Sequence, residues 1–251
     1  MRSGVQSNYG WFCLQLFRFA LLSVSTWASA VACELKVAVE RQAYMPYYSI
    51  ESGQYVGYAR ELLDAFAQSI DCHFVYQALP VKRADDSFLG GQLDFRFPDN
   101  PEWNTELKSS FPVYYSDPVI DFIDGMLVLP QHLGRGVGGV HELGTLLGFT
   151  PAHYEQDIKN GTIVLRQLQN TEALLQMGLK GRVDAIYMNP VVARAALKQK
   201  PDALRFDPEL PHLAGYYYLS SLKHPELLER FNVFLRDSDE LQQSLRKKYG
   251  L

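Results

Sequence analysis

Hydrophobic and polar positions along residues 33–97 switch between the period of a strand and the period of a helix. The helical pattern is clearest in "GYARELLDAFAQSI", where Ala59, Leu62, Leu63, Phe66 and Ile70 fall on one face. The pattern predicts strands over 34–40, 73–79 and 93–97 and helices over 58–70 and 80–89. Because a strand–helix–strand crossover is right-handed and returns in the same direction, we expect the strands to be parallel.

The same alternation returns after residue 140. It predicts strands over 144–149, 162–168 and 183–188 and helices over 151–160, 171–180 and 190–199. Two extended runs, 113–131 and 213–222, lie on either side of this second series, and two helical patterns close the chain. The sequence therefore predicts an α/β fold of two lobes joined by a two-stranded hinge. The first lobe is expected to span 33–124 and 214–251, and the second 125–213.

One short pattern occurs once in each predicted lobe, as "GQLDFRFPDNP" (91–101) and as "GRVDAIYMNP" (181–190). Each glycine follows a helical pattern and is typical of a helix C-terminal cap. Each Asn-Pro pair is typical of a helix start, with asparagine as the N-cap and proline at the first helical position. Asn100 and Asn189 are therefore predicted at the carboxyl ends of strands, the edge where open α/β sheets bind ligands.

Residues 1–32 contain Arg2, Arg18 and no acidic residue. After Arg18 comes the apolar run "FALLSVSTWASAVA", which ends in Ala-x-Ala patterns. This predicts a secretory signal peptide cleaved after Ala30 or Ala32 and a periplasmic mature protein, since the run is short for a membrane span. An uncleaved anchor is the alternative. We expect no membrane insertion after cleavage.

The composition of the 251-residue chain, 47% hydrophobic and 21% charged, is that of a globular protein. Loss of the signal peptide removes two of the 24 basic residues and none of the 28 acidic ones, which leaves a net charge of −6. No cluster of lysine and arginine interleaved with aromatics is present, which argues against nucleic acid as a partner. We expect a monomer.

Two cysteines remain after cleavage, Cys33 and Cys72, each directly before a predicted strand. If these parallel strands are neighbours, their starting ends lie within disulfide distance. Export supplies the oxidising compartment, so a Cys33–Cys72 disulfide is predicted. The alternative interpretation of "AVAC" is a lipobox with Cys33 as a lipidated N-terminus.

No motif of a hydrolase, a metal site or a phosphate-binding loop is present, and the histidines lack metal-ligand spacing. "GRGVGG" (134–139) lacks the strand, helix and acidic residue of a dinucleotide site. We therefore predict no cofactor, no metal and no catalytic residue. Aromatic residues do gather near the expected binding edge, and tyrosine suits small, partly polar ligands. The candidates are Tyr44, Tyr47, Trp103 and Tyr187.

Several segments in order and spacing resemble the extracytoplasmic solute-binding proteins of family 3, which bind polar amino acids for ABC importers. The segments are "YMPYYS", "GQYVGYARELLDAFA", "GGQLD", "VYYSDPV", "GRVDAIYMNPVVA" and "HPELLERFNVFL". The resemblance covers residues 33–251. It implies the type II periplasmic-binding-protein fold, a small polar solute held between two lobes, and an ABC permease as partner.

The sequence departs from this family at both ends of the usual amino-acid clamp. The arginine that precedes the "FS-x-P-Y" pattern is missing, with Lys108 as the only cation there, and Asn189 stands where an ammonium-binding aspartate is common. A neutral amide binds an ammonium less strongly than a carboxylate does. Thr150 matches the position where the family presents a helix N-terminus to the ligand carboxylate. From the first lobe, Arg83, Arg96, Asp99 and Asn100 are the further candidate contacts.

Two other functions remain open from the sequence. Some relatives on this fold are periplasmic dehydratases, and a buried acid facing an arginine in the cleft would favour an enzyme of that kind. A receptor that senses its ligand without transporting it is the other alternative.

Overall fold

The computed structural model describes residue 4 and residues 33–251. The predicted signal peptide, residues 1–32, therefore lies almost wholly outside the described part of the chain. Among the described residues, no helix has the length and apolar character needed to cross a membrane.

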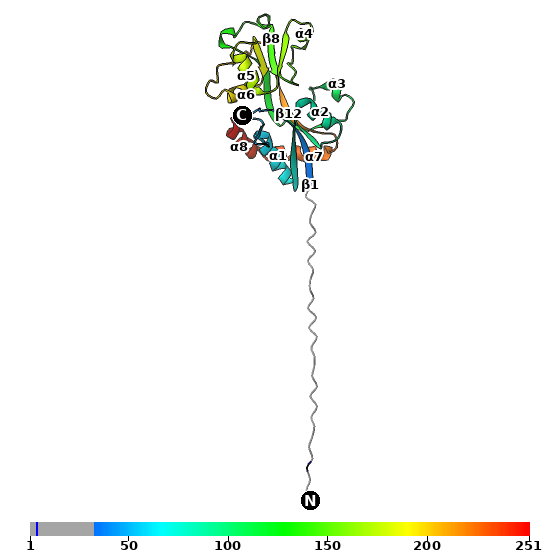
Figure 1. The fold of residues 1–251 in the computed structure, drawn as a ribbon. Helices are drawn as coiled ribbons and strands as arrows, with labels where there is room; N and C mark the ends of the chain where they lie inside the picture. Colours follow the sequence, from blue (N-terminus) through cyan, green and yellow to red (C-terminus); the bar gives the residue numbers. More distant parts are fainter. Residues whose placement is uncertain (1–3, 5–32) are drawn as a thin grey trace. The chain divides into compact units, whose positions relative to one another are not determined.

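The first lobe is built on three parallel strands with β1 in the middle, paired with β4 from Cys33–Cys72 to Glu40–Leu79 and with β5 on its other side (Figure 1). The predicted apolar face of the first helix is confirmed, since Leu62, Leu63 and Phe66 are fully buried. The main elements are β1 (Cys33–Glu40), α1 (Tyr58–Ser69), β4 (Cys72–Leu79), α2 (Val81–Leu89), β5 (Phe95–Asp99), α7 (Pro225–Asp237) and α8 (Asp239–Tyr249). Smaller ones are β2 (Ser49–Glu51), β3 (Gln54–Val56), α3 (Thr105–Lys108) and β6 (Tyr114–Tyr115).

The second lobe repeats this plan with three parallel strands, in which β8 lies between β9 and β10. Helix α5 packs on these strands and contributes the buried Leu174 and Leu175. The elements are β8 (Glu142–Leu146), α4 (Glu155–Lys159), β9 (Val164–Leu168), α5 (Thr171–Leu179), β10 (Ala185–Met188), α6 (Pro190–Ala196) and β11 (Arg205–Phe206), with short 3-10 helices at Pro130–His132 and Val137–Gly139.

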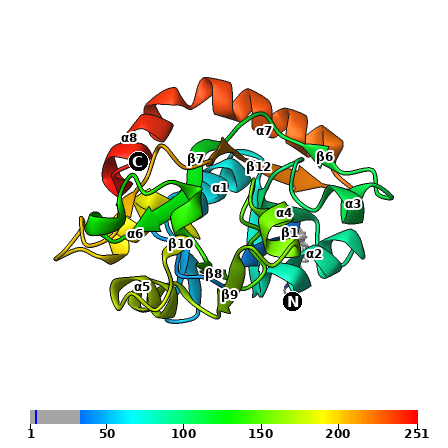
Figure 2. The same cartoon turned by 90° about the horizontal axis from the view of Figure 1, so that it is seen from above.

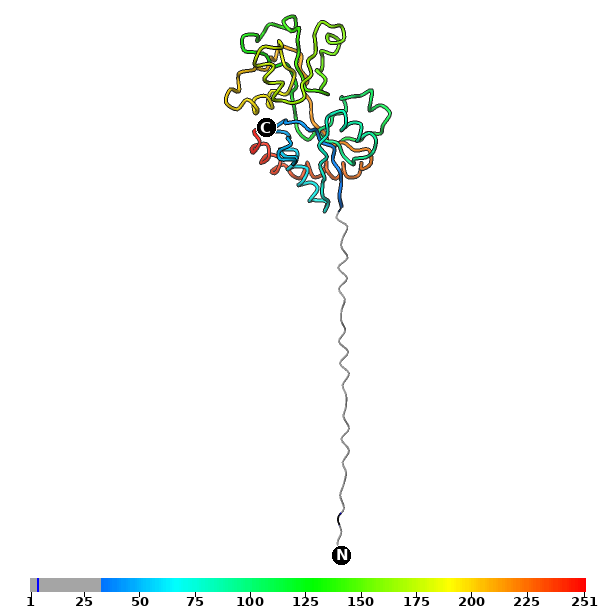
Figure 3. The backbone as a smooth tube through the Cα atoms, in the orientation of Figure 1, coloured from blue at the N-terminus to red at the C-terminus, as the bar shows by residue number. Residues whose placement is uncertain are grey.

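Two long strands, β7 (Ile120–Val128) and β12 (Leu213–Ser221), connect the lobes. They pair antiparallel from Leu213–Asp124 to Tyr217–Ile120, and join the two sets of strands in the order β4-β1-β5-β12-β7-β10-β8-β9. Figure 2 shows α7 and α8 along this junction, and Figure 3 follows the chain back to the first lobe, where α8 packs on α1. The predicted two-lobed α/β fold is confirmed. The lobe boundaries at 124/125 and 213/214 stay a prediction, and they fall at one end of the β7–β12 pairing.

The glycine–aspartate pattern has the same structure in both lobes. Gly91 and Gly181 follow α2 and α5 with φ of 70° and 60°, the left-handed region that favours glycine. Three residues later, the carboxylate of Asp94 accepts a hydrogen bond from Lys36 N at 2.8 Å, and that of Asp184 accepts one from Glu142 N at 2.8 Å. Each aspartate thus fixes the start of its own strand to the neighbouring strand.

The two Asn-Pro junctions differ, which corrects one prediction. Asn189 is the N-cap of α6, and its Oδ1 accepts from Val191 N at 2.8 Å and Val192 N at 3.3 Å. Asn100 Oδ1 accepts from Glu102 N at 2.8 Å, but a turn comes next in place of a helix, and only the four-residue α3 comes later. The helix expected over 151–160 also begins late, at Glu155, because Pro151 and a left-handed His153 hold the chain in a turn.

The predicted disulfide between Cys33 and Cys72 is present, with the two Cα atoms 4.5 Å apart. The two cysteines are register partners at the start of β1 and β4. A sulfur atom in a disulfide cannot also carry a thioether-linked lipid, so this bond and the lipobox alternative exclude each other.

Replacing Cys72 with serine should lower the free energy of unfolding by roughly 3–4 kcal/mol, because the disulfide closes a loop between cysteines that are 39 positions apart in the sequence. Denaturant unfolding of the mature protein measures this. Cys33→Ser serves as the matched control, because it breaks the same bond and should cost the same. A reductant should destabilise the wild type and leave both variants unchanged; an equal effect on all three would contradict the assignment.

Candidate functional site

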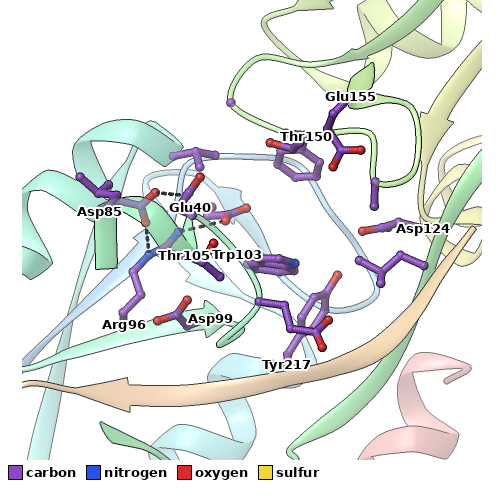
Figure 4. Close-up of a pocket in the computed structure, with 18 of the residues that line it drawn as sticks. Glu40, Asp85, Arg96, Asp99, Trp103, Thr105, Asp124, Thr150, Glu155 and Tyr217 are labelled. Atoms are coloured by element: carbon purple, nitrogen blue, oxygen red, sulfur yellow. Dashed lines mark hydrogen bonds and ion pairs between the residues drawn. The ribbon is translucent and has the colours of Figure 1, made fainter. Parts of the chain in front are cut away.

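A cavity of about 1030 Å³ lies between the lobes and is lined by residues of both lobes and of the connecting strands (Figure 4). Its volume is at the upper end of the range for ligand sites. The polar and aromatic residues of the lining include Glu40, Tyr48, Asp85, Arg96, Asp99 and Trp103 from the first lobe, Asp124 and Tyr217 from β7 and β12, and Thr150, Glu155 and Tyr187 from the second lobe.

The cavity lies at the carboxyl ends of parallel strands, as the sequence predicts for a ligand site. Glu40 is the last residue of β1, Asp99 is the last residue of β5, and Tyr187 is one residue from the end of β10. The lobes approach closely beside it: a Cβ on Gly148, whose φ is 91°, would lie 2.9 Å from the Val81 Cβ. Any larger residue there would force the lobes apart.

Arg96 is fully buried at one end of the cavity between two carboxylates (Figure 4). Its Nε donates to Asp85 Oδ1 at 2.9 Å and its Nη2 to Glu40 Oε1 at 3.2 Å. Burial alone would lower the pKa of Arg96, but the two carboxylates outweigh it and raise the pKa. Burial raises the pKa of Glu40 despite the opposing effect of Arg96. The guanidinium is therefore permanently charged and already neutralised, and its Nη1 has no hydrogen-bond partner among the described residues.

Both carboxylate oxygens of Asp99 already accept hydrogen bonds from other residues of the protein. Lys108 Nζ donates to its Oδ1 at 2.5 Å, and Ser220 Oγ donates to its Oδ2 at 2.6 Å. Lys108 also donates to Asn100 O at 2.8 Å, and its side chain is largely buried. Lys108, the only cation of the segment before "VYYSDPV", is thus held by Asp99.

Asp124 is the one buried carboxyl of the lining without a cationic partner among the described residues. Its only hydrogen bond there is a long one, in which Tyr44 donates to Oδ1 at 3.4 Å. Burial raises the pKa of Asp124 from its ordinary value of 3.8 to about 7, with a further small effect from Glu40. A buried charge is costly unless it is paired, so this carboxyl is protonated for part of the physiological pH range.

Aromatic rings form the walls between these polar ends. Tyr217 stacks on Phe122 with ring centroids 4.6 Å apart, and Trp103 packs against both rings at 5.7–5.9 Å. From the second lobe, the Tyr187 side chain is almost wholly buried, and its hydroxyl forms no hydrogen bond within the described part of the chain. A buried hydroxyl without a partner is costly, so a ligand oxygen that reached it would be bound favourably.

Tyr44, Tyr47 and Asn189 contact one another across the lobes, outside the cavity lining. Tyr44 OH accepts from Asn189 N at 3.2 Å, and Asn189 Nδ2 donates to Tyr47 OH at 3.4 Å. Asn189 is fully buried. Asn189 is therefore bonded to two tyrosine hydroxyls of the other lobe.

The candidate residues from the sequence fall into two groups. Five of them line the cavity: Arg96, Asp99, Trp103, Thr150 and Tyr187. The others lie elsewhere: Tyr44, Tyr47 and Asn189 at the contact between the lobes, Asn100 donating to Tyr216 O at 3.0 Å, and Arg83 exposed on α2. Thr150 precedes a turn and not the start of α4, which begins five residues later.

Sequence reasoning missed Asp124, Glu40 and Asp85. A signal for Asp124 is present in "IDFIDG", because Ile120, Phe122 and Asp124 alternate as the inward positions of β7. A carboxylate in an inward position of a strand is unusual enough to mark a site. Among the described residues, no group of three histidine, cysteine or acidic side chains is placed to hold a metal ion.

Comparison with protein-family models and with curated proteins finds no match. Solved structures do match. An ancestral arginine-binding protein bound to arginine has a TM-score of 0.71 at 22% identity, covering 86% of this chain and 97% of that one. The arginine-, lysine-, histidine-binding protein ArtJ of Geobacillus stearothermophilus has a TM-score of 0.68 at 20% identity, covering 86% and 94%.

A third similar structure is an ancestral amino acid-binding protein described as a precursor of cyclohexadienyl dehydratase. Its TM-score is 0.67 at 21% identity, over 86% of this chain and 95% of that one. The chain thus has the two-lobed fold of these binding proteins, over nearly their whole length.

Asn189→Ala should destabilise the protein more than Asn170→Ala, by roughly 1–2 kcal/mol. Both asparagines cap a helix of the second lobe, but Asn170 is exposed and bonds only Ala173 N of its own helix. The difference between the two variants therefore measures the contacts of Asn189 with the tyrosines. Equal losses in denaturant unfolding would show that these contacts contribute nothing.

Asp124→Asn should stabilise the ligand-free protein at alkaline pH. A carboxyl whose pKa is raised in the folded state contributes stability below its unfolded pKa and loses it as pH rises through the folded pKa, here from about 4 to about 7. Above pH 7 the variant should gain on the order of 2–4 kcal/mol over wild type, and near pH 4 almost nothing. The titratable groups facing Asp124 are Glu40 and the tyrosines 44, 47, 187 and 217. Unfolding curves between pH 4 and pH 8.5 test this, and a difference independent of pH would contradict it.

Proposed function

We propose that this protein is an extracytoplasmic solute-binding protein that traps a small polar ligand between its two lobes. The observation that carries the proposal is the cavity, whose lining comes from both lobes and from the strands that connect them. A ligand that contacts both lobes binds the closed state better than the open one and shifts the population toward it. The fold shared with amino-acid-binding proteins supports the same function.

We infer that the partner is an ABC permease, which would receive the ligand from the closed protein. The predicted signal peptide supports a periplasmic location, and we expect the mature protein to be a monomer. We also propose that the ligand is delivered to an importer and not to a sensor protein. This proposal rests on the family resemblance of residues 33–251 and on the solved structure of the binding protein of an amino acid ABC transporter, similar at a TM-score of 0.68.

An ordinary α-amino acid is disfavoured as the ligand, because both ends of the usual clamp are occupied. Lys108 is bound by Asp99, and Asn189 is bound by Tyr44 and Tyr47. Neither group reaches the cavity lining. A ligand of this protein is therefore expected to be held by other residues of the lining.

An enzyme on the same fold is the second candidate, and Asp124 is the observation that favours it. A buried carboxyl with a pKa of about 7 is suited to act as a general acid at neutral pH. Incubating the protein with each ligand that binds, followed by mass spectrometry of the solute, decides between the two. Conversion with turnover establishes an enzyme, and unchanged solute supports a binding protein.

The fluorescence of Trp103 provides a direct binding assay. The other two tryptophans of the chain, Trp11 and Trp27, lie in the predicted signal peptide, so Trp103 is the single tryptophan of residues 33–251. A bound ligand should change its emission and, at about 100 times its Kd, raise the melting temperature by roughly 5–10 °C. The panel is amino acids, amines, organic acids, sugars and short peptides. If no solute class changes either signal, the proposed function is wrong.

Tyr187→Phe should weaken the binding of the tightest ligand of that panel by about fivefold, which is the effect of losing one hydrogen bond. The cavity keeps its shape because only the hydroxyl is removed. Tyr154→Phe is the matched control: the ring of Tyr154 packs against Tyr187, but its hydroxyl donates to Pro211 O, outside the cavity lining. Equal weakening by the two variants would place the hydroxyl of Tyr187 outside the binding site.

A further inference from the structure

The lining of the cavity is strongly acidic. Within the part of the chain that the structure describes, it contains seven carboxylates, and Arg96 is its single lysine or arginine. Three of the seven have cationic partners in the protein: Glu40 and Asp85 share Arg96, and Asp99 is paired with Lys108. The four carboxyl groups that remain have no cationic partner among the described residues. They are Glu102, Glu106, Asp124 and Glu155.

Exposed acidic residues alone are solvated and indicate no ligand, but Asp124 is nine-tenths buried. Among the described residues it forms no ion pair, and a single hydrogen bond of 3.4 Å reaches its Oδ1. In Figure 4 its carboxyl group projects into the cavity from β7, opposite the Asp85–Arg96–Glu40 group. A buried carboxylate needs a positive partner, and this one faces the space where a ligand would lie.

The walls beside Asp124 favour the same kind of ligand. The rings of Trp103 and Tyr217 line the cavity with centroids 5.9 Å apart. Aromatic faces attract cations, most strongly where water is excluded. Tyr187 lines the cavity from the second lobe, and its buried hydroxyl has no hydrogen-bond partner among residues 33–251.

A ligand carboxylate would find little to bind it. The guanidinium of Arg96 is already paired with Glu40 and Asp85, and its Nη1 is a buried atom without a hydrogen-bond partner among the described residues. A carboxylate placed there would also face the unpaired carboxylates of the lining, and like charges repel at short range.

We propose that the cavity binds a small organic cation, an amine or guanidinium compound, with its positive group on Asp124, and that an α-carboxylate on the ligand weakens binding. The inference rests on the proposed solute-binding function and specifies the chemical class of the ligand.

Pairs of compounds that differ only in the α-carboxylate test this on the mature protein: agmatine against arginine, and cadaverine against lysine. Isothermal titration and Trp103 fluorescence give the affinities. Each decarboxylated compound should bind at least about tenfold more tightly than its amino acid, because it lacks the α-carboxylate that the carboxylates of the lining repel. Equal or tighter binding of the amino acids would overturn the proposal.

Asp124→Asn tests the position of the positive group. The variant should bind the tighter amine at least about tenfold more weakly, because a neutral amide replaces the counter-ion. It is not expected to unfold, since its carboxyl is uncompensated in the ligand-free protein. Asp121→Asn is the matched control on the same strand: Asp121 is exposed and paired with Arg246, so this change should leave the affinity unaltered. Unchanged binding by the Asp124 variant, or an equal loss in both, would overturn the assignment.

The outcomes separate this inference from the proposed function. Tight binding of a neutral or acidic solute, with no response to amines, would overturn the cation preference and leave a solute-binding protein. A lack of response to every solute class would contradict both the cation preference and the solute-binding function.

Discussion

The pairing of β7 with β12 is the interaction on which the rest of the molecule depends. Both connections between the lobes run through it, so its register fixes the position of one lobe relative to the other. The same pairing places Asp124 opposite Leu213, where both residues line the cavity. Asn100 strengthens the junction by donating to Tyr216 O. The strands that hold the lobes together therefore also carry part of the candidate site.

Each lobe brings its polar residues to this junction by the same route. A helix ends at a glycine, an aspartate fixes the next strand, and the strand delivers its last residues to the cleft. In the first lobe the last residue of the strand is Asp99, a carboxylate paired with Lys108. In the second lobe the residues are Tyr187, which lines the cavity, and Asn189, which caps a helix and bonds the opposite lobe. The end of β5 is thus charged, and the end of β10 is neutral.

Much of the fold could be predicted from local patterns. The helix of residues 58–70, the parallel strands and the two crossings arise from periodicity, and the disulfide from two cysteines at the starts of neighbouring strands. The prediction was wrong where a short segment departs from its local preference, as in the turn after Asn100. Asparagine and proline in sequence begin a turn as readily as a helix, and the residues after the proline decide between the two.

The site was predicted less completely, because its character depends on contacts between distant segments. Asn189 is a helix cap by sequence, as observed, but nothing local indicates that Tyr44 and Tyr47, more than 140 residues earlier, cover it. Likewise, "FRF" gives no sign that Arg96 is neutralised by Glu40 and Asp85. A charged residue in a sequence shows its own charge, and only the fold shows whether that charge remains available to a ligand.

Binding of a cation at Asp124, as proposed, would be coupled to protons. Near neutral pH the carboxyl carries a proton for part of the time, and an arriving cation would displace that proton. Binding at this group would therefore be an exchange, in which one positive charge enters the cleft as another leaves for the solvent. The charge inside the closed protein would then change little on loading. The heat measured for binding would include the ionisation of whichever buffer takes up the released proton.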